Sequence, residues 1–217
     1  MGATPTALIT GVSRGLGKEL ARQYAADGWN VIGTERRKDA QFRLDVTDRN
    51  DISRLAKKLN GEPIDLLFCN AGISGKKGMA PGSFDFGSWE EVLRVNLLGP
   101  AALAEVLTDN VAASERRTIA MMSSRLGSIS ESSGMTLPYS TSKAALNMLV
   151  KGLAATLAAR GITVVALSPG WVRTDMGGEG APLSPEASVR GLRKVIAGLK
   201  PADSGKFFSH DGSAIPW

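Results

Sequence analysis

Short apolar runs and helical spacings alternate along the chain. Residues 7–10 form an apolar run that ends at a cluster of glycines, as a buried strand does before a turn. Beyond that cluster, Leu16, Leu20 and Tyr24 lie four positions apart, which places them on one face of a helix over residues 15–27. The beginning of the chain therefore predicts a strand, a glycine turn and a helix.

The same two patterns recur to the end of the chain. Apolar runs predict further strands at residues 31–34, 65–69, 118–123, 163–167 and 207–209, and helical spacings predict helices at 89–111, with a bend at Gly99-Pro100, and at 139–160. Strands that alternate with helices imply a parallel sheet with helices on both faces. Neither a repeat nor a low-complexity linker divides the sequence. We therefore predict an α/β fold with a single doubly wound domain over residues 1–217.

One connection in this pattern is unusually short. Only residues 35–41 separate the second strand from a further apolar segment at 42–44. A parallel crossover generally needs a dozen residues or more, including a helix. A helix of this length would advance only about 10 Å, whereas an extended chain covers roughly 3.3 Å per residue. We therefore predict that the crossover helix after the second strand is missing, and that residues 42–44 complete a mainly parallel, seven-stranded sheet.

Composition narrows the class of protein. The 217 residues fit one domain with a substantial core, and the apolar runs are too short to span a membrane. The net charge of +5 is dispersed, without the clustered basic and aromatic residues of a nucleic-acid interface. Cys69 is the one cysteine, so an internal disulfide is excluded and a cytoplasmic location is expected. Neither Cys69 nor His210 lies in a metal-binding arrangement, and we expect no metal, nucleic-acid or membrane partner.

The glycine turn points to a phosphate-binding site. Gly11, Gly15 and Gly17 stand between the first strand and the first helix with the spacing G-x-x-x-G-x-G. Such glycines permit a tight turn, a close approach of the backbone to a pyrophosphate, and close packing of helix on strand. The helix N-terminus adds free N–H groups and a partial positive charge. The spacing differs from the common G-x-G-x-x-G fingerprint of dinucleotide-binding folds.

Tyr139 and Lys143 form a candidate proton-transfer pair. They lie four positions apart at the start of a predicted helix and therefore share one face. A free phenol has a pKa of about 10. A neighbouring ammonium favours the phenolate and lowers this pKa, so we expect Lys143 to make Tyr139 a useful acid and base near neutral pH.

Four motifs occur in an order that resembles a known family. The glycine turn, Asn70-Ala71-Gly72, Tyr139 with Lys143, and Ser168-Pro169-Gly170 together resemble the short-chain dehydrogenase/reductase family. Residues 123–128 and 169–176 are most similar to its small C-factor-like and sniffer-like carbonyl reductase members. The resemblance covers essentially the whole chain and implies one Rossmann-type domain that carries both the cofactor and the substrate sites.

The resemblance also implies an activity. It is that of an NAD(P)-dependent oxidoreductase, which transfers a hydride between nicotinamide and a small carbonyl or alcohol substrate. Tyr139 would be the general acid in reduction and the general base in oxidation. Lys143 would tune Tyr139 and hold the nicotinamide ribose, and Asn96 would hold a water on a proton relay. A non-catalytic regulatory or signalling protein that senses NAD(P) is the alternative function.

The catalytic serine is open between two candidates. The family pattern S-x-x-G fits Ser124 and Gly127, although Ser124 lies fifteen residues before Tyr139, slightly farther than is usual in the family. Extra residues can loop out after Gly127, so Ser124 is the preferred candidate and Ser128 is the competitor. Ser123 should point to the opposite side of its strand.

The resemblance implies a set of cofactor contacts, with the choice between NAD and NADP open. Glu35 after the second strand favours NAD slightly, whereas Arg14 and Arg36 favour the 2′-phosphate of NADP. Asp45 is expected at the adenine and Asp48 at a helix cap. The expected contacts are Gly11, Ser13, Arg14, Gly15, Leu16, Gly17, Glu35, Arg36, Asp45, Val46, Asn70, Ala71, Gly72, Tyr139, Lys143, Pro169, Gly170, Val172 and Thr174.

The substrate site is less defined. Met135, Leu137, Trp171 and Met176 are candidates for apolar walls. The glycine-rich insertion at residues 177–181 is short for a lid, and its glycines predict mobility and an open site. The substrate, the physiological direction and the oligomeric state, with a homo-oligomer as one alternative, stay open.

Overall fold

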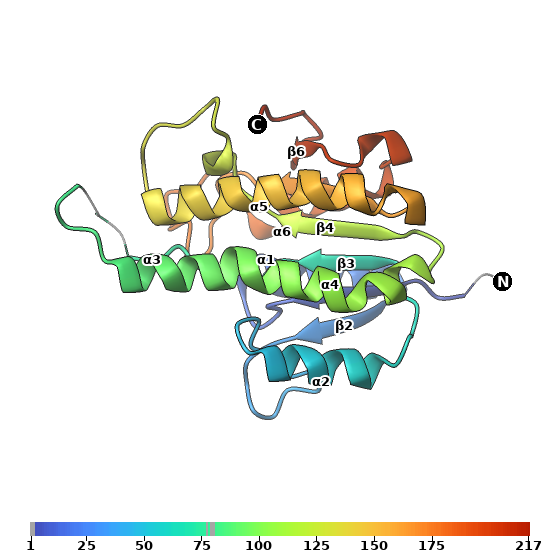
Figure 1. Ribbon diagram of the computed structural model, residues 1–217. Helices are drawn as coiled ribbons and strands as arrows, with labels where there is room; N and C mark the ends of the chain where they lie inside the picture. The colour runs from blue at the N-terminus through green and yellow to red at the C-terminus, as the bar shows by residue number, and fades with distance from the viewer. Residues whose placement is uncertain (1–2, 77, 79–80) are drawn as a thin grey trace.

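A parallel sheet organises the computed structural model, which describes residues 3–76, 78 and 81–217 (Figure 1). Residues 1, 2, 77, 79 and 80 of the predicted domain lie outside the described residues. The strands are β1 (Thr6–Thr10), β2 (Asn30–Thr34), β3 (Leu66–Cys69), β4 (Thr118–Met122), β5 (Thr163–Ser168) and β6 (Phe207–Ser209). The longer helices are α1 (Gly15–Ala26), α2 (Arg49–Leu59), α3 (Phe86–Leu93), α4 (Gly99–Ala112), α5 (Leu137–Thr156) and α6 (Pro185–Ala197).

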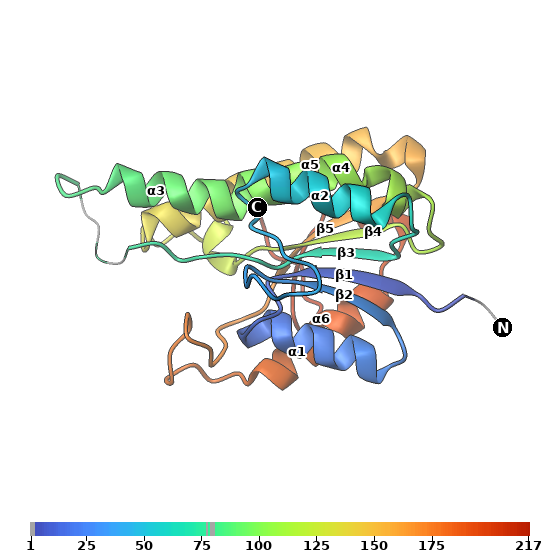
Figure 2. The same ribbon diagram turned by 90° about the horizontal axis from the view of Figure 1, so that it is seen from below.

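The strand order is β2-β1-β3-β4-β5-β6, and every pair is parallel. Helices α2, α4 and α5 cover one face of the sheet, and α1 and α6 cover the other (Figure 2). This arrangement confirms the predicted doubly wound α/β fold. The chain reverses its direction of winding between β1 and β3, and the carboxyl ends of strands at such a switch point border a crevice.

Both faces of the sheet are buried, which explains why the strands are apolar throughout. Consecutive side chains of β1 alternate between two cores, because successive residues of a strand point to opposite faces. Leu8 packs in the core that includes Leu107 of α4, whereas Ile9 packs in the core that includes Leu20 of α1. All three leucines and Ile9 are fully buried.

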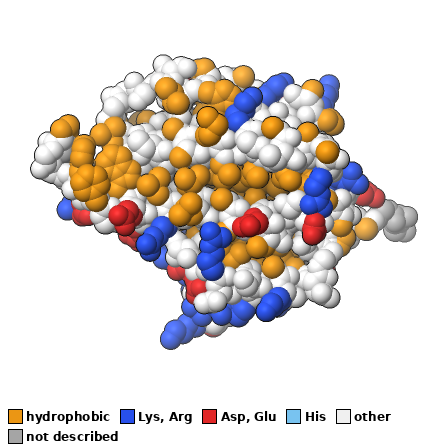
Figure 3. Space-filling model, viewed as in Figure 1, with side chains coloured by type: hydrophobic (Ala, Val, Ile, Leu, Met, Phe, Trp, Pro, Cys, Tyr) orange, Lys and Arg blue, Asp and Glu red, His pale blue; other side chains and the backbone are white. Residues whose placement is uncertain are grey.

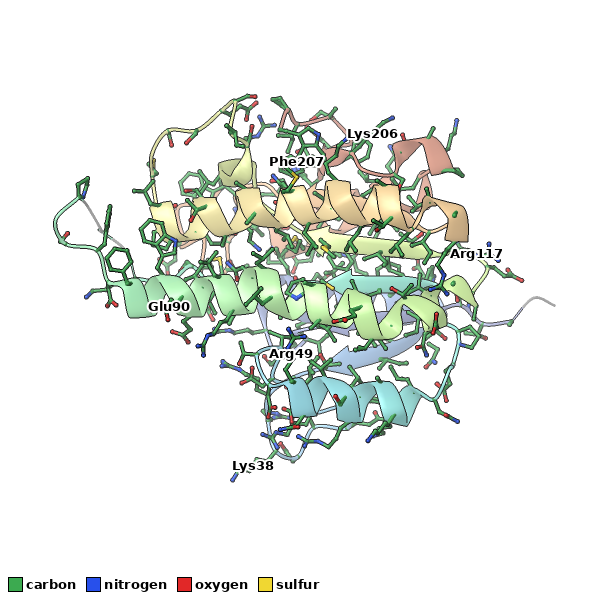
Figure 4. All side chains as sticks on the ribbon, viewed as in Figure 1. Lys38, Arg49, Glu90, Arg117, Lys206 and Phe207 are labelled. Carbon is green, nitrogen blue, oxygen red and sulfur yellow. The ribbon has the colours of Figure 1, made fainter. Side chains whose placement is uncertain are left out.

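The connection after β2 lacks a crossover helix, as predicted. No helix forms over residues 35–41, and Glu35 and Arg43 make one parallel bridge. Residues 42–44 nevertheless do not form a strand, so the described residues contain six strands rather than the predicted seven. The reason is that Leu44, only 2% exposed, enters the core with residues of α2 and α4, which takes the chain away from the sheet edge. Lys38 lies at the outer end of this loop (Figure 4).

Apolar side chains also gather on one outer face. Figure 3 shows them in a row over α3, α4 and α5. Leu98, Val106 and Met148 are 49%, 36% and 72% exposed, respectively. Among the described residues, no helix combines the length and the apolar character that a membrane span needs.

The position of Leu107 leads to a test of the core. Leu107→Ala should lower the free energy of unfolding by about 2–5 kcal/mol, because it leaves a cavity between α4 and the sheet. The neighbouring Val106→Ala is the control and should change the free energy by no more than about 0.5 kcal/mol. Denaturant unfolding measures both. Equal effects of the two variants would contradict the burial described for α4.

Candidate active site

A cavity of about 260 Å³ lies at the carboxyl ends of the central strands. Its walls come from the glycine turn, the segments after β2, β3 and β5, the end of β4, the end of α3 with the turn that follows it, and the start of α5. Most of the predicted cofactor contacts line it: Gly11, Ser13, Arg14, Gly15, Leu16, Gly17, Glu35, Arg36, Asp45, Val46, Asn70, Ala71, Gly72, Tyr139, Lys143, Pro169 and Thr174. The structure therefore brings together residues that are up to 163 positions apart, from Gly11 to Thr174.

Some predicted site residues do not line the cavity, and some lining residues were not predicted. Asn96, Ser124, Gly170 and Val172 are absent from its walls. Val172 is 4% exposed, and its backbone makes a parallel bridge with Leu183. The unpredicted lining residues are Thr34, Leu44, Ile73, Glu91, Val95, Met122, Ser123 and Asp175. Proximity in the sequence to Asn96 and Thr174 was the one available signal for Val95 and Asp175.

The glycine turn leaves room for an anionic group. Gly11 and Gly15 have φ angles of 76° and 54°, which favour glycine. A Cβ on Gly17 would overlap the carbonyl oxygen of Gly11 and lie 2.5 Å from Asn70 Nδ2. Helix α1 has no side-chain cap and no acidic residue in its first turn, so no side chain of α1 itself competes with an anion for its first N–H groups. This cradle fits the phosphates of a dinucleotide.

Hydrogen bonds hold the turn against the end of β3. Asn70 Nδ2 donates to the carbonyl oxygen of Thr10 at 2.9 Å. Thr10 Oγ1 accepts from the backbone N–H groups of Asn70 and Ala71, both at 3.0 Å. The Asn70-Ala71-Gly72 motif therefore fixes the two strands on either side of the switch point relative to each other.

Helix α5 places Tyr139 and Lys143 on the cavity wall in successive turns. Lys143 Nζ donates to the carbonyl oxygen of Met122, at the end of β4, at 2.8 Å and lies 5.5 Å from the centre of the Tyr139 ring. Burial lowers the pKa of Lys143 to about 8. Burial also raises the pKa of Tyr139 to about 12, and a hydrogen bond with the Ser124 hydroxyl offsets part of this increase.

The expectation that Lys143 lowers the Tyr139 pKa is therefore wrong for this structure. The reason is geometric, because the ammonium is directed to the Met122 carbonyl and not to the phenol oxygen. Ser124 provides the hydrogen bond to the phenol instead.

The three neighbouring serines have different partners. Ser124 contacts Tyr139 and also accepts from the N–H of Leu126 at 3.2 Å. Ser128, in contrast, is 1% exposed and donates to the carbonyl oxygen of Pro216 at 2.7 Å. Ser123 donates to Asn147 Oδ1 at 2.6 Å. Of the two open candidates, Ser124 is the one that the fold brings to Tyr139.

Asn96 lies in a π-helical turn, η1 (Arg94–Leu98), which joins α3 to α4 in place of the predicted bend at residues 99–100. Its side chain is fully buried and bonded to protein groups on both atoms. Oδ1 accepts from Ile73 N at 2.9 Å, while Nδ2 donates to Ile73 O at 2.9 Å and to Ser142 Oγ at 3.0 Å. The side chain thus ties the segment after β3 to α5.

The far end of the cavity carries several charges. Glu35 is engaged by Arg37, with Oε2 3.3 Å from Nε. Arg36 lines the cavity and is exposed. Partial burial raises the pKa of Asp45, but hydrogen bonds from the Thr47 backbone and hydroxyl outweigh it, so this pKa lies below its usual value. Asp48 accepts from Asn50 N and caps α2, as expected.

The predicted apolar walls are only partly gathered at the site. Met176 lines the cavity, whereas Met135, Leu137 and Trp171 do not. Met135 and Trp171 are 62% and 60% exposed. One hydrogen bond ties the glycine-rich insertion to the segment before it, since Trp171 Nε1 donates to the carbonyl oxygen of Gly177 at 2.8 Å.

Comparison with known proteins identifies the family. Residues 5–182 match the family model described as short chain dehydrogenase. The chain belongs to the short-chain dehydrogenase family. As a member, it is an oxidoreductase that acts on a carbonyl or alcohol group, and the predicted resemblance to this family is confirmed.

Several known proteins are similar over most of the chain. C-signal of Myxococcus xanthus is 40% identical over 156 residues, which are 71% of this chain and 93% of that protein. The crystal structure of NADPH-bound carbonyl reductase from chicken fatty liver has a TM-score of 0.90 and 28% identity, with both chains fully covered. Carbonyl reductase Sniffer of D. melanogaster has a TM-score of 0.91 and 29% identity, and the match covers 99% of this chain and 100% of Sniffer.

The buried Lys143 predicts a pH dependence of stability. Its pKa is about 8 in the folded protein against an ordinary value of 10.5, so the unfolded state binds more protons between these two values. The contribution of Lys143 to the free energy of unfolding therefore rises as the pH increases through this window. Denaturant unfolding of the wild type and of Lys143→Met should show a stability difference, wild type minus variant, that rises with pH.

Groups present in both proteins, such as the buried Cys69, cancel in this difference. A difference that stays constant between about pH 7 and about pH 11 would mean that Lys143 is solvated in the folded protein.

Proposed function

We propose that this enzyme is an NADP-dependent reductase of small carbonyl compounds, with Tyr139 as the general acid. The observation that carries the proposal is the arrangement on α5. Tyr139 shares a hydrogen bond with Ser124, and Lys143 is buried beside it on the wall of the cavity that begins at the glycine turn. The whole of residues 1–217 would act as one NAD(P)-binding domain that holds both the cofactor and the substrate.

The cavity supports a dinucleotide position. Gly11 to Gly17 and the N-terminus of α1 would hold the phosphates, Asp45 and Val46 with Asn70 to Gly72 the adenosine, and Pro169 and Thr174 the nicotinamide end. Gly170 and Val172 do not line the cavity. They would hold the backbone of residues 169–174 in place without touching the cofactor. The bound nicotinamide would supply the hydride to the substrate carbon.

The protein would supply the proton. A phenol with a pKa of about 12 is protonated at neutral pH, which suits a donor to a carbonyl oxygen and favours the reducing direction. Ser124 would donate a hydrogen bond to the same oxygen. Lys143, whose pKa of about 8 is close to neutral, would restore the proton on Tyr139. Asn96 would act as a positioning residue through Ile73 and Ser142, because both its amide hydrogens and one lone pair of Oδ1 are engaged, and the second lone pair of Oδ1 could accept from a relay water.

Three observations favour NADP over the slight sequence preference for NAD. Arg37 engages the Glu35 carboxylate, which weakens the repulsion that Glu35 would exert on a 2′-phosphate. Arg14 and Arg36 both line the cavity and could bind such a phosphate. The chicken liver carbonyl reductase, which is similar over its whole length, was crystallised with NADPH.

The convergence of Ser124, Tyr139 and Lys143 also favours an enzyme over a non-catalytic sensor of NAD(P). A sensor needs the cradle for the dinucleotide but has no use for a hydrogen-bonded phenol on its wall.

Replacing the proposed acid should separate chemistry from binding. Tyr139→Phe should reduce carbonyl reduction by about 10²–10⁴-fold, because only the proton donor is lost. NADPH binding, measured by fluorescence titration, should be retained. Tyr24→Phe is the matched control, since Tyr24 is the other of the two tyrosines and lies in α1 outside the cavity. A Tyr139→Phe enzyme with more than half the wild-type rate would place the acid elsewhere.

Cofactor choice can be tested at Arg36. Arg36→Ala should weaken NADPH binding by roughly tenfold, the size expected for a charge-assisted hydrogen bond, and leave NADH binding unchanged. Lys38→Ala is the control, because Lys38 lies at the outer end of the same loop (Figure 4). Paired titrations of both cofactors measure the effect. An equal loss for NADH and NADPH would argue against a 2′-phosphate site at Arg36.

A further inference from the structure

An ion pair crosses the mouth of the cavity. Arg14 Nη1 of the glycine turn lies 2.9 Å from Oδ2 of Asp175, which follows β5. Both residues line the cavity, and their side chains are 74% and 75% exposed. Beside them, a Cβ on Gly15 would lie 3.6 Å from the Thr174 methyl group. The pair therefore links the proposed phosphate site to the segment that follows β5.

The segment that carries Asp175 has a fixed base. Arg173 N donates to Leu183 O at 2.9 Å, and Leu183 N donates to Trp171 O at 3.3 Å. The Arg173 guanidinium also donates to the carbonyl oxygens of Ala181 and Pro182 at 3.0 and 2.8 Å. Figure 2 shows this segment, just before α6, extending beside the start of α1. Asp175 therefore reaches Arg14 from a loop that is anchored independently of that contact.

Asp175 pairs with the Arg14 guanidinium, the cation that a cofactor phosphate would need. Arg14 makes one hydrogen bond to this carboxylate, whereas a phosphate can accept two parallel bonds from a guanidinium and carries more charge. An exposed ion pair is weak, so a phosphate can displace it. NADP would have to break this pair to gain Arg14, whereas NAD would leave the pair intact.

We propose that Asp175 is a specificity-determining residue, which competes with the 2′-phosphate of the cofactor for Arg14. In the cofactor-free protein the carboxylate holds Arg14, and this reduces the preference for NADP over NAD. When the phosphate binds, Arg14 turns to it and the tip of the loop at Asp175 is released. This inference rests on the proposed NADP site.

The test is a double-mutant cycle on cofactor binding. Asp175→Asn removes the competing charge and keeps the shape of the side chain. It should strengthen NADPH binding by about two- to fivefold at low ionic strength, the range expected for an exposed ion pair, and leave NADH binding unchanged. In an Arg14→Ala background the same substitution should have no effect on NADPH. Glu179→Gln is the matched control, because it removes one negative charge from the same loop and should change neither affinity.

Each other outcome overturns the inference in a distinguishable way. Weaker NADPH binding in Asp175→Asn would mean that the pair preorganises the site rather than competing for it. An equal gain for both cofactors, or the same gain in Glu179→Gln, would mean a general effect of charge. If Arg14→Ala weakens NADPH binding while Asp175→Asn changes nothing, this inference fails and the NADP site stands. If neither Arg14→Ala nor Arg36→Ala affects NADPH binding, the proposed NADP site fails as well.

Discussion

The contact between the β1–α1 turn and the end of β3 is the constraint on which the site depends. Gly17 lies so close to the Gly11 carbonyl that no side chain fits between them. Asn70 and Thr10 join the two strand ends by hydrogen bonds at the same place. Because these strands flank the switch point, this contact sets the width of the crevice and directs the free N–H groups of α1 into it. A larger side chain at Gly17 would separate helix from strand and disturb both halves of the cavity.

The part of the site that α5 provides depends on the buried amino group of Lys143. Lys143 is 3% exposed and donates a hydrogen bond to the Met122 carbonyl, so burial disfavours its charged form. Close packing keeps it there, since a Cβ on Gly127 would lie 2.7 Å from the Lys143 backbone. Asn147, one turn further along α5, donates to the Gly127 carbonyl at 3.0 Å. The segment that carries Ser124 and the helix that carries Tyr139 are therefore positioned by the same contacts.

The sequence predicted those features of the fold and the site that depend on neighbouring residues. The glycine turn, the pair on α5 and the short link after β2 were readable because each depends on residues close in sequence or on chain length. The direction of the Lys143 ammonium and the engagement of the Asn96 amide were not readable, because their partners, Met122 and Ile73, lie 21 and 23 positions away. Likewise, Asp175 became a lining residue only once a loop 161 positions from Arg14 was placed beside it. Residues 42–44 leave the sheet because Leu44 packs in the core, and this packing also depends on residues distant in the sequence.

The loop after β2 has a consequence for the behaviour of the chain in concentrated solution. β2 is an edge strand of five residues, and an edge strand is a template on which another polypeptide can add by backbone pairing. Here the loop folds back on the carboxyl end of that edge, where Glu35 N donates to Phe42 O and Leu44 N donates to Glu35 O at 2.9 Å. The exposed charges of Arg36, Arg37 and Lys38 surround the same end. A loop that is too short for a helix thus protects the β2 edge of the sheet against pairing with another chain.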